Sequence, residues 1–439
     1  MKNVLSKVAL AALAVGGVTG VNSAAHAQTP PPPTIQPMNG APEIRDGEQR
    51  FKVRGRLQYD VYSNEWDAGV DSPLVSPSVD AEDGSRSYVR RAFLGVQGRF
   101  SDNWRYKVDF VLNPGASGDD ATTGDAAVAV DDAYLEYAGD FFSVVIGENN
   151  VTAPLEDRTS SLDIPFLERS SIINAYGYGR AAGVAGLVTG ANWMAAIGVY
   201  GDSLNNSDSN FANSEQTSIS GRFTWAPIFE TSPDGVTLLH LGVSARQRYN
   251  GDDALFRYRP RPLNGRGSRW VESSSGSATQ DDLSYGFEVA GQWNAFGFTG
   301  EYITLEGETP AGVQVESDGY YVDLTWSLTG EARSYRGNQG SFGPVVPHNP
   351  VTEGGWGHWG LIARYDFIDL SDIDAGTARG EQTAYAFGVN WVPIDHVRFM
   401  LNYASTEMDR VVNTFPVAPG ISAPDAEADV ISLRTQFDF

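Results

Sequence analysis

The chain has 439 residues and a formal charge of −24, from 31 Lys and Arg against 55 Asp and Glu, and it contains no Cys. This acidic balance argues against nucleic-acid binding, which needs a basic surface, and the lack of Cys excludes disulfides and thiolate metal sites. Hydrophobic residues make up only 41% while aromatics reach 11%, a mixture that suits a β-barrel with one apolar and one wet face.

Residues 1–27 have the pattern of a secretory signal peptide. Lys2 and Lys7 form a positive start, an apolar run covers 8–18, and Ala25-His26-Ala27 is a small-x-small cleavage site. An N-terminal membrane anchor is the alternative, but this apolar run is shorter than the about 20 residues that a spanning helix needs. Charged residues interrupt every other apolar stretch, which excludes a helical membrane protein.

Residues 28–48 follow as a Pro-rich segment, with four consecutive prolines at 30–33. This composition predicts an extended periplasmic linker without a core, placed ahead of the first strand.

Strict alternation of apolar and polar residues begins at Phe51 and recurs to the C-terminus. A two-residue period indicates strands that separate an apolar from a polar medium. The set comes to about sixteen strands, an even number that closes an antiparallel up-and-down barrel. We therefore predict an all-β transmembrane β-barrel domain over 49–439. The strands are expected near 49–63, 87–100, 103–112, 129–138, 141–148, 180–189, 192–200, 215–226, 236–249, 283–294, 296–305, 316–328, 355–368, 381–392, 397–408 and 429–439.

The connections alternate between short turns and long acidic or Gly-rich segments, as in outer-membrane barrels with short periplasmic turns and long outer loops. Residues 329–354 break the rule, because their place predicts a periplasmic turn and yet they are long. The long outer segments lie at 64–86, 113–128, 149–179, 201–214, 250–282, 369–380 and 409–428.

The last strand alternates to the end of the chain and places Phe437 and Phe439 on its apolar face. This ending looks like the signal by which barrel-assembly machinery recognises its clients. The alternative is a secreted β-sandwich or β-helix that buries the same faces in a core. Sandwich strands usually run about five or six residues, and the expected strands are longer, with aromatics near their ends as in interfacial girdles. The sequence thus predicts a cell outer membrane location.

Several motifs resemble the phosphate-selective porin O/P family, and the similarity spans most of 49–439. The resemblance implies a homotrimer of barrels, a loop at 149–179 that folds inward to narrow the pore, and phosphate or polyphosphate as solutes of some members. This chain has only Lys52 and Lys107 beyond the signal peptide, whereas phosphate-selective members cluster lysines in the pore. The motifs are Arg90-Arg91-Ala92-Phe93-Leu94-Gly95-Val96, Trp104 to Phe110, Asp132 to Tyr137, Pro154-Leu155-Glu156, Thr159-Ser160-Ser161 and Phe166-Leu167-Glu168-Arg169.

In a porin the functional groups are charges that project into the water-filled lumen, where they set ion preference. Arg suits an oxyanion because its planar fork donates two parallel hydrogen bonds. Arg246 and Arg248 lie one pleat repeat apart and would form a step for a passing anion. The alternative is that the arginines pair with wall carboxylates and brace the barrel. The expected anion path comprises Arg54, Arg56, Arg91, Arg99, Arg105, Lys107, Arg222, Arg246, Arg248 and Arg364, and the other wall cations are Lys52, Arg398 and Arg434. The wall anions are Asp60, Asp109, Asp132, Glu136, Glu288, Glu301, Asp323, Asp366 and Asp438.

Two loops carry further charge. The expected constriction loop holds Glu156, Arg158, Glu168 and Arg169, a mixture that would set pore size more than ion choice. Five arginines in an outer loop would collect anions at the mouth, or bind lipopolysaccharide phosphates or a loop of a neighbouring subunit. This mouth cluster is Arg257, Arg259, Arg261, Arg266 and Arg269.

Enzyme motifs are absent from the sequence. No pair among the five His has metal-ligand spacing, and no Gly-x-Ser-x-Gly nucleophile motif occurs. We expect no enzyme activity, cofactor or metal. The predicted function is passive diffusion of small hydrophilic solutes with a preference for anions. The alternatives are a non-selective porin with structural arginines and a structural or adhesive barrel. The expected partners are outer-membrane lipid, lipopolysaccharide, the assembly machinery and small anions as permeants, with no nucleic acid.

Overall fold

The computed structural model describes residues 34–67, 84–112, 128–205, 216–232, 235–250, 256–267, 269–273, 279–373, 379–410 and 425–439. The expected signal peptide at 1–27 lies outside these residues, as do parts of several expected outer loops. In the described part of the chain no helix is long and apolar enough to cross a membrane.

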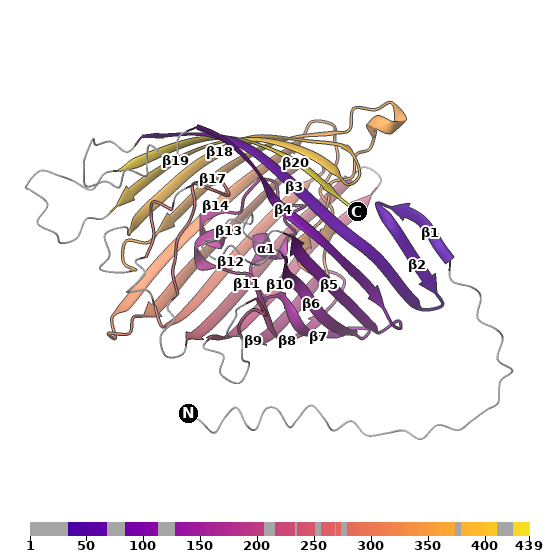
Figure 1. Cartoon of the computed structure of the whole chain (residues 1–439), viewed down its shortest axis with the longest axis horizontal. Coiled ribbons are helices and arrows are strands. Elements are labelled where there is room, and N and C mark those ends of the chain that lie inside the picture. Colours follow the sequence, from indigo (N-terminus) through magenta and orange to yellow (C-terminus); the bar gives the residue numbers. More distant parts are fainter. Residues whose placement is uncertain are drawn as a thin grey trace, which may run out of the picture.

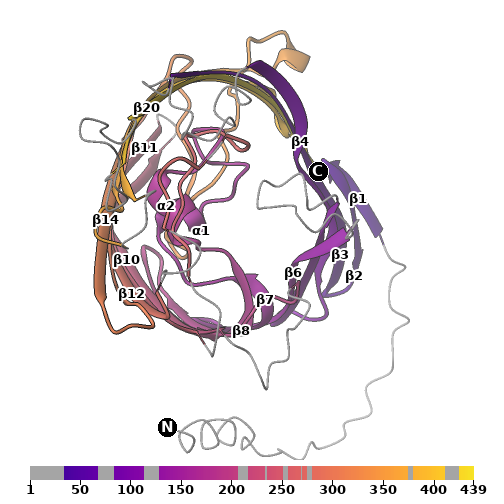
Figure 2. The same ribbon diagram turned by 60° about the vertical axis from the view of Figure 1, so that its left-hand side comes forward.

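Sixteen of the described strands pair antiparallel with their neighbours and close into one barrel (Figures 1 and 2). The ring closes where the last strand pairs with the first, from Glu427–Asp67 to Asp438–Arg56. Closure pairs the backbone groups of every edge, as a lipid environment requires. The predicted barrel is thereby confirmed. Its strands are β3(Gln49–Asp67), β4(Gly84–Arg99), β5(Trp104–Leu112), β6(Val128–Ala138), β7(Phe142–Asn150), β8(Arg180–Thr189), β9(Trp193–Tyr200), β10(Gln216–Ser232), β11(Gly235–Asn250), β12(Asp281–Trp293), β13(Phe296–Glu308), β14(Gln314–Ser327), β17(His358–Asp369), β18(Gly380–Ile394), β19(Val397–Arg410) and β20(Ala426–Asp438).

The exposure pattern of the barrel is the inverse of that of a soluble protein. Large apolar side chains face outward, with Phe287 58% exposed, whereas inward-facing Arg434 is completely buried. Exposed Trp and Phe gather at the end with the short turns, as at Trp293 and Trp356, while the exposed tyrosines of β12, β13, β14 and β18 lie toward the opposite end. An apolar belt between two aromatic girdles is the outer surface of a barrel in lipid.

The expected linker at 28–48 needs correction where the structure describes it. Residues 34–46 form a hairpin of β1(Thr34–Asn39) and β2(Ala41–Asp46), and β2 pairs with β3 from Glu43–Lys52 to Asp46–Gln49. The reason is that β3 begins seven residues before its pairing with β20 starts, which leaves an unpaired edge that β2 satisfies. Figure 1 shows the hairpin beside the C-terminus.

Three segments fold back into the lumen. The inner loop (residues 151–179) carries α1(Leu155–Arg158) and α2(Ser171–Tyr176), and Figure 2 shows both helices inside the barrel. The Arg-rich loop (256–273, described except at 268) packs Tyr258 against Tyr176 of α2 and Trp270 against Trp66 of β3, in an apolar cluster with the outer ends of the wall strands. The periplasmic insert (328–357) leaves the barrel at the short-turn end and carries β15(Tyr335–Arg336), β16(Ser341–Phe342) and the 3-10 helix η3(Val351–Glu353).

The periplasmic insert differs from the simple turn expected at 329–354. Its start is fixed at the periplasmic end, where Ser327 N donates to Ala295 O of the neighbouring turn at 2.8 Å. From there its β15–β16 hairpin enters the lumen, because Tyr335 and Phe342 pack with inward-facing Leu238 and Ala290 of the wall. The lumen is therefore narrowed from both ends.

Candidate functional site

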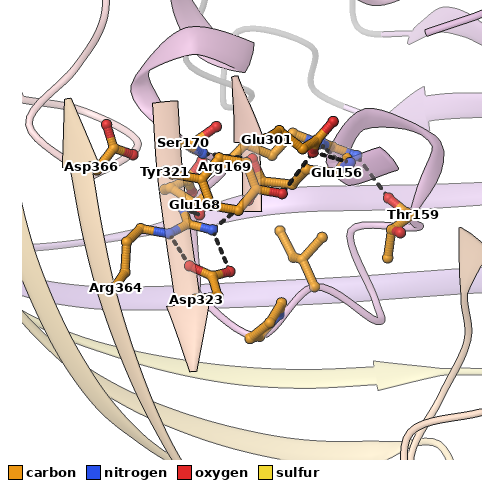
Figure 3. A network of polar contacts seen from close by, with 12 residues as sticks. Glu156, Thr159, Glu168, Arg169, Ser170, Glu301, Tyr321, Asp323, Arg364 and Asp366 are labelled. Atoms are coloured by element: carbon orange, nitrogen blue, oxygen red, sulfur yellow. Dashed lines mark hydrogen bonds and ion pairs between the residues drawn. The ribbon is translucent and has the colours of Figure 1, made fainter. Parts of the chain in front are cut away.

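The inner loop is fastened to the barrel wall by buried ion pairs (Figure 3). Arg364 on β17 donates to Asp323 on β14 through two nitrogens at 2.7 and 2.8 Å, and to Glu156 of the loop at 2.6 Å. All three side chains are buried. Because an unpaired buried charge is costly, each of these groups holds the others in place.

A second buried centre surrounds Glu168. Arg90 on β4 donates to both carboxylate oxygens at 2.7 and 2.8 Å, and Arg434 on β20 donates at 3.0 Å. Arg434 also pairs with Asp60 through two hydrogen bonds of 2.7 Å. Burial alone would raise the pKa of the Glu168 carboxyl, but its two arginines hold that pKa well below its usual range.

Wall carboxylates also cap the two short helices of the inner loop. Glu301 accepts hydrogen bonds from the backbone N–H groups of Leu155 and Glu156 at 2.8 and 2.7 Å, and Asp366 accepts from Ser171 N at 2.9 Å. The first N–H groups of a helix have no partner within it, so these carboxylates satisfy them. Arg169 closes α1 from the other side by donating to three carbonyl oxygens of residues 156, 157 and 159. Arg158 is half-buried and donates to Asn150 O at 3.3 Å.

Two β-bulges turn extra charges into the lumen. In β4 the register shifts between Arg91, paired with Gln58, and Val89, paired with Tyr59, so that Arg90 and Arg91 both face inward. In β6 the shift at Asp131 does the same for Asp131 and Asp132. The alternation rule missed Arg90 and Asp131, although each belongs to a like-charged doublet that breaks the two-residue period. Bulges re-aim side chains in this way.

The carboxylates of Asp109, Asp131 and Asp132 lie within 4.8 Å of one another. Cations already occupy this group. Lys107 bonds to Asp132 and lies 3.2 Å from Asp109, and Arg180 lies 3.0 Å from both Asp131 and Asp132. Arg54 lies 3.4 Å from Asp109, so three cations face three carboxylates and the cluster is an ionic network of the wall.

Half of the expected anion path is buried in bracing contacts. Arg246 donates to the carbonyls of Tyr176 and Gly177 at 2.6 and 3.0 Å, and Arg248 pairs with Asp282 through Nε at 2.9 Å. Their burial favours the bracing alternative over a step for a passing anion. The same holds for three further residues: Arg56, which donates to Ser161 Oγ at 2.9 Å, Arg222, which pairs with Glu288 at 2.8 Å, and Arg364.

The other half keeps contact with the lumen. The side chains of Arg54 and Arg99 are 24% and 25% exposed, that of Arg105 is 56% exposed, and Lys107 and Arg91 are partly buried. Arg54 lies 3.4 Å from Asp109, Arg99 2.9 Å from Asp102 and Arg105 3.8 Å from Glu136. Of the wall charges expected from the sequence, seven of thirteen cations remain at least partly exposed, against two of nine anions.

The mouth cluster lies on the Arg-rich loop, which folds into the barrel. Arg257 pairs with Glu272 at 3.0 Å, Arg261 donates to Gly267 O at 2.6 Å, and Arg269 donates to Arg259 O. Arg266 lies over the ring of Tyr88 at 5.0 Å. All five arginines are partly buried, so they hold the loop as well as line the outer lumen.

The C-terminus is held at the seam of the barrel. Phe437 faces outward and is 42% exposed, while Phe439 exchanges two backbone hydrogen bonds with Gly55 at 3.0 and 3.1 Å. The ring of Phe439 covers Gly55 so closely that a Cβ there would lie 2.4 Å from a ring carbon. A Cβ at position 55 would force the terminal ring to move, whereas glycine leaves room for it.

A cavity of about 460 Å³ lies between the inner loop and the periplasmic insert. Arg333 and Arg336 of the insert line it together with Arg54, Arg398 and Asp163. Sequence reasoning missed Arg333 and Arg336, because they lie in a connection to which alternation assigns no face.

Known proteins share this sequence pattern and architecture. The family described as phosphate-selective porin O and P matches residues 51–439. An uncharacterized protein of Caulobacter vibrioides is 29% identical over 428 residues, covering 94% of this chain and 80% of that protein. Porin O of Pseudomonas aeruginosa is 28% identical over 428 residues, covering 90% and 89%.

Solved structures agree at the level of the fold. The anion-selective porin from Comamonas acidovorans is similar with a TM-score of 0.52 and 13% identity, covering 89% of this chain and all of that one. The trimer form of OmpT from Vibrio cholerae has a TM-score of 0.52 at 12% identity, covering 89% and 99%.

Proposed function

This chain belongs to the phosphate-selective porin O and P family, and from that premise we propose that it is an outer-membrane porin whose pore prefers anions. Membership and fold make it a porin of the outer membrane. The preference for anions is the proposal, with inorganic phosphate as the candidate solute that the family name suggests.

The unequal exposure of wall charges supports the proposal. The wall carboxylates of Asp60, Glu288, Glu301, Asp323 and Asp366 are at most 5% exposed, because they are used in pairing with wall arginines or in capping the inner loop. Arg54, Arg99 and Arg105 keep at least 24% of their side chains accessible. A solute in the lumen therefore meets more positive than negative charge, although the whole chain is acidic.

Ion selectivity in planar bilayers tests the proposal. With a KCl gradient at low salt, the reversal potential should show that Cl⁻ passes more readily than K⁺, and the preference should shrink near 1 M salt because screening shortens the reach of the charges. Replacing chloride by phosphate should retain a measurable current. A reversal potential of the opposite sign would refute the anion preference, and absence of discrete steps would favour a structural barrel.

We further propose a homotrimer, the form in which the Vibrio cholerae protein of the same fold is described. The terminal Phe437 and Phe439 are proposed as the signal read by the assembly machinery.

A further inference from the structure

The periplasmic insert is fixed inside the lumen at several points. Arg222 on β10 donates to Gly340 O at 2.6 Å, His240 Nδ1 on β11 lies 2.6 Å from Tyr335 Oη, and Gln292 on β12 donates to Arg333 O at 3.1 Å. Three neighbouring strands thus hold the β15–β16 hairpin against one side of the barrel. A segment held in this way presents a fixed set of side chains to the pore.

The start of the insert is anchored by Glu331. Its carboxylate accepts hydrogen bonds from Ser327 Oγ and His348 N, each at 3.0 Å, and lies 3.0 Å from His358 Nδ1. Burial opposes ionisation, but these contacts and one with Thr329 hold the pKa of Glu331 at about 2. Glu331 is therefore ionised at neutral pH, and its carboxylate is used in hydrogen bonds within the insert and to Ser327 and His358.

Four arginines line the cavity between the insert and the inner loop, and three of them differ from Arg54, which lies 3.4 Å from Asp109. Arg336 is exposed, and its guanidinium makes no hydrogen bond or ion pair with any residue in the described ranges. Arg333 donates to Asp163 O at 3.1 Å and stacks on Phe342 at 4.0 Å. Arg398 donates to the carbonyls of residues 162, 164 and 165 at 2.9 to 3.1 Å. Among the described residues, none of the three has a carboxylate within ion-pair distance.

Asp163 is the carboxylate that opposes them from the inner loop. Its side chain lines the same cavity. All three arginines interact with it electrostatically. Of the other carboxylates that line the cavity, Glu331 is anchored as above, Asp438 pairs with His396 at 2.9 Å, and Asp395 is exposed in the short turn between β18 and β19. Three arginines without a carboxylate partner among the described residues thus share a space of about 460 Å³ with Asp163 and Asp395, two carboxylates that keep some exposure.

We propose that Arg336 and Arg333 of the periplasmic insert, with Arg398 of β19, form the filter that sets the ion preference of this pore, and that Asp163 tunes it. This inference rests on the proposed porin function but not on the sign of its selectivity. The buried wall arginines shape the channel, and the filter is the place where cationic groups without carboxylate partners meet the solute. Its ligands are small anions, including chloride and oxyanions.

Charge-removing substitutions in full-length, outer-membrane-extracted protein test the filter by reversal potential in a KCl gradient at low salt. Arg336→Gln should lower the Cl⁻/K⁺ permeability ratio about threefold, and Arg333→Gln with Arg336→Gln about tenfold. Asp163→Asn should raise the ratio about twofold. The matched control is Arg45→Gln, which removes the same charge from the β1–β2 hairpin, where Arg45 pairs with Glu43 at 2.6 Å and does not line the cavity of the filter. The control should leave the ratio unchanged.

The two proposals fail separately. If wild-type protein prefers K⁺ but Arg336→Gln still lowers the Cl⁻/K⁺ ratio, the proposed anion preference is wrong and the filter stands. If the single and double variants keep the wild-type ratio, or Arg45→Gln shifts it as much as they do, the filter is refuted while the porin function stands. Arg336→Gln should fold normally because its guanidinium has no partner to lose, so the single variant remains informative if the double variant assembles poorly.

Discussion

Glu168 is the residue on which the attachment of the inner loop depends most, because two arginines from opposite sides of the barrel seam meet on it. Glu168→Gln removes the charge that buried Arg90 and Arg434 share, and it leaves Arg434 paired with Asp60. We expect a loss of about 3–5 kcal/mol of stability, as for other broken buried pairs. The midpoint temperature at which the folded band disappears on a denaturing gel should fall clearly.

The matched control for that change is Glu272→Gln. Glu272 pairs with Arg257 at 3.0 Å, but both side chains are about a third exposed, and such a pair is worth at most about 1 kcal/mol. If Glu168→Gln and Glu272→Gln had equal midpoint temperatures, the buried ion pairs around Glu168 would contribute no more to stability than an exposed ion pair.

Asp163 predicts a dependence of selectivity on pH. Burial raises the pKa of the Asp163 carboxyl to about 6, although Arg336, Arg398 and Arg333 oppose the rise and Asp438 adds to it. Above this pKa the carboxylate is ionised and cancels part of the arginine charge, and below it the group is neutral. The Cl⁻/K⁺ ratio should therefore increase as the pH falls from about 7 to about 5, as measured by reversal potential.

Asp163→Asn is the control, because it retains His358 and His396, which line the same cavity. Its ratio should be high at both pH values, and any remaining pH dependence would belong to the histidines. A wild-type ratio that does not change with pH, or a variant as pH-dependent as the wild type, would contradict the role of Asp163.

At the residue scale, the sequence predicts which face a side chain takes but not the partner it meets. Alternation placed Arg364 and Arg246 inside the barrel, and both lie there. Their partners Glu156 and Tyr176 belong to a loop some 70 to 200 positions away, and no local pattern encodes such a distance. Where two consecutive charges interrupt the alternation, as at Arg90 and Asp131, a bulge changes the register and the rule fails.

At the scale of elements, the seam between β3 and β20 depends on the last residue of the chain. Deletion of Phe439 removes two backbone hydrogen bonds to Gly55 and the ring that covers it. Gly55→Val should act in the same way, because its side chain would occupy the place of the ring. Both changes should lower recovery in the outer membrane fraction, while processing at the expected cleavage site after Ala27 should continue.

Gly186→Val is the control for Gly55→Val, since Gly186 also lies in a strand but has open space where its Cβ would be. Normal recovery of the Phe439 deletion would remove the terminal residue from the assembly signal. Poor recovery of Gly186→Val would show that any β-branched replacement of a strand glycine disturbs the barrel.

The elements that the sequence predicted well are those with a long two-residue period, as in β13 and β19, because one face must meet lipid and the other water. The elements it missed have no such period. β2 is a strand because β3 extends past the end of β20 and offers it an edge. The β15–β16 hairpin enters the lumen because wall residues such as Arg222 and His240 receive it.

At the scale of the whole molecule, the lumen is divided by its own segments. α2 and the Arg-rich loop fill the outer end of the lumen, where they form an apolar cluster with β13, β14 and β17. The periplasmic insert occupies the periplasmic end of the lumen beside β10 to β12. A barrel of this strand number is too wide to be filled by its wall side chains alone. The inserted segments therefore reduce the pore, and they bring charged groups close enough to a passing ion to act on it.

The proposed trimer has consequences for how the folded protein behaves. Because each barrel closes its own hydrogen-bonded ring, each subunit should carry a separate pore and three should open together. Unheated samples on a denaturing gel should migrate near three times the mass of the boiled chain, and insertion events in bilayers should close in three equal steps. Glu168→Gln should lower the temperature of this conversion without changing the number of steps, since its centre lies within one barrel. A folded, unheated band at the mass of a single chain, with single-step closure, would contradict the trimer and leave the pore of each barrel unaffected.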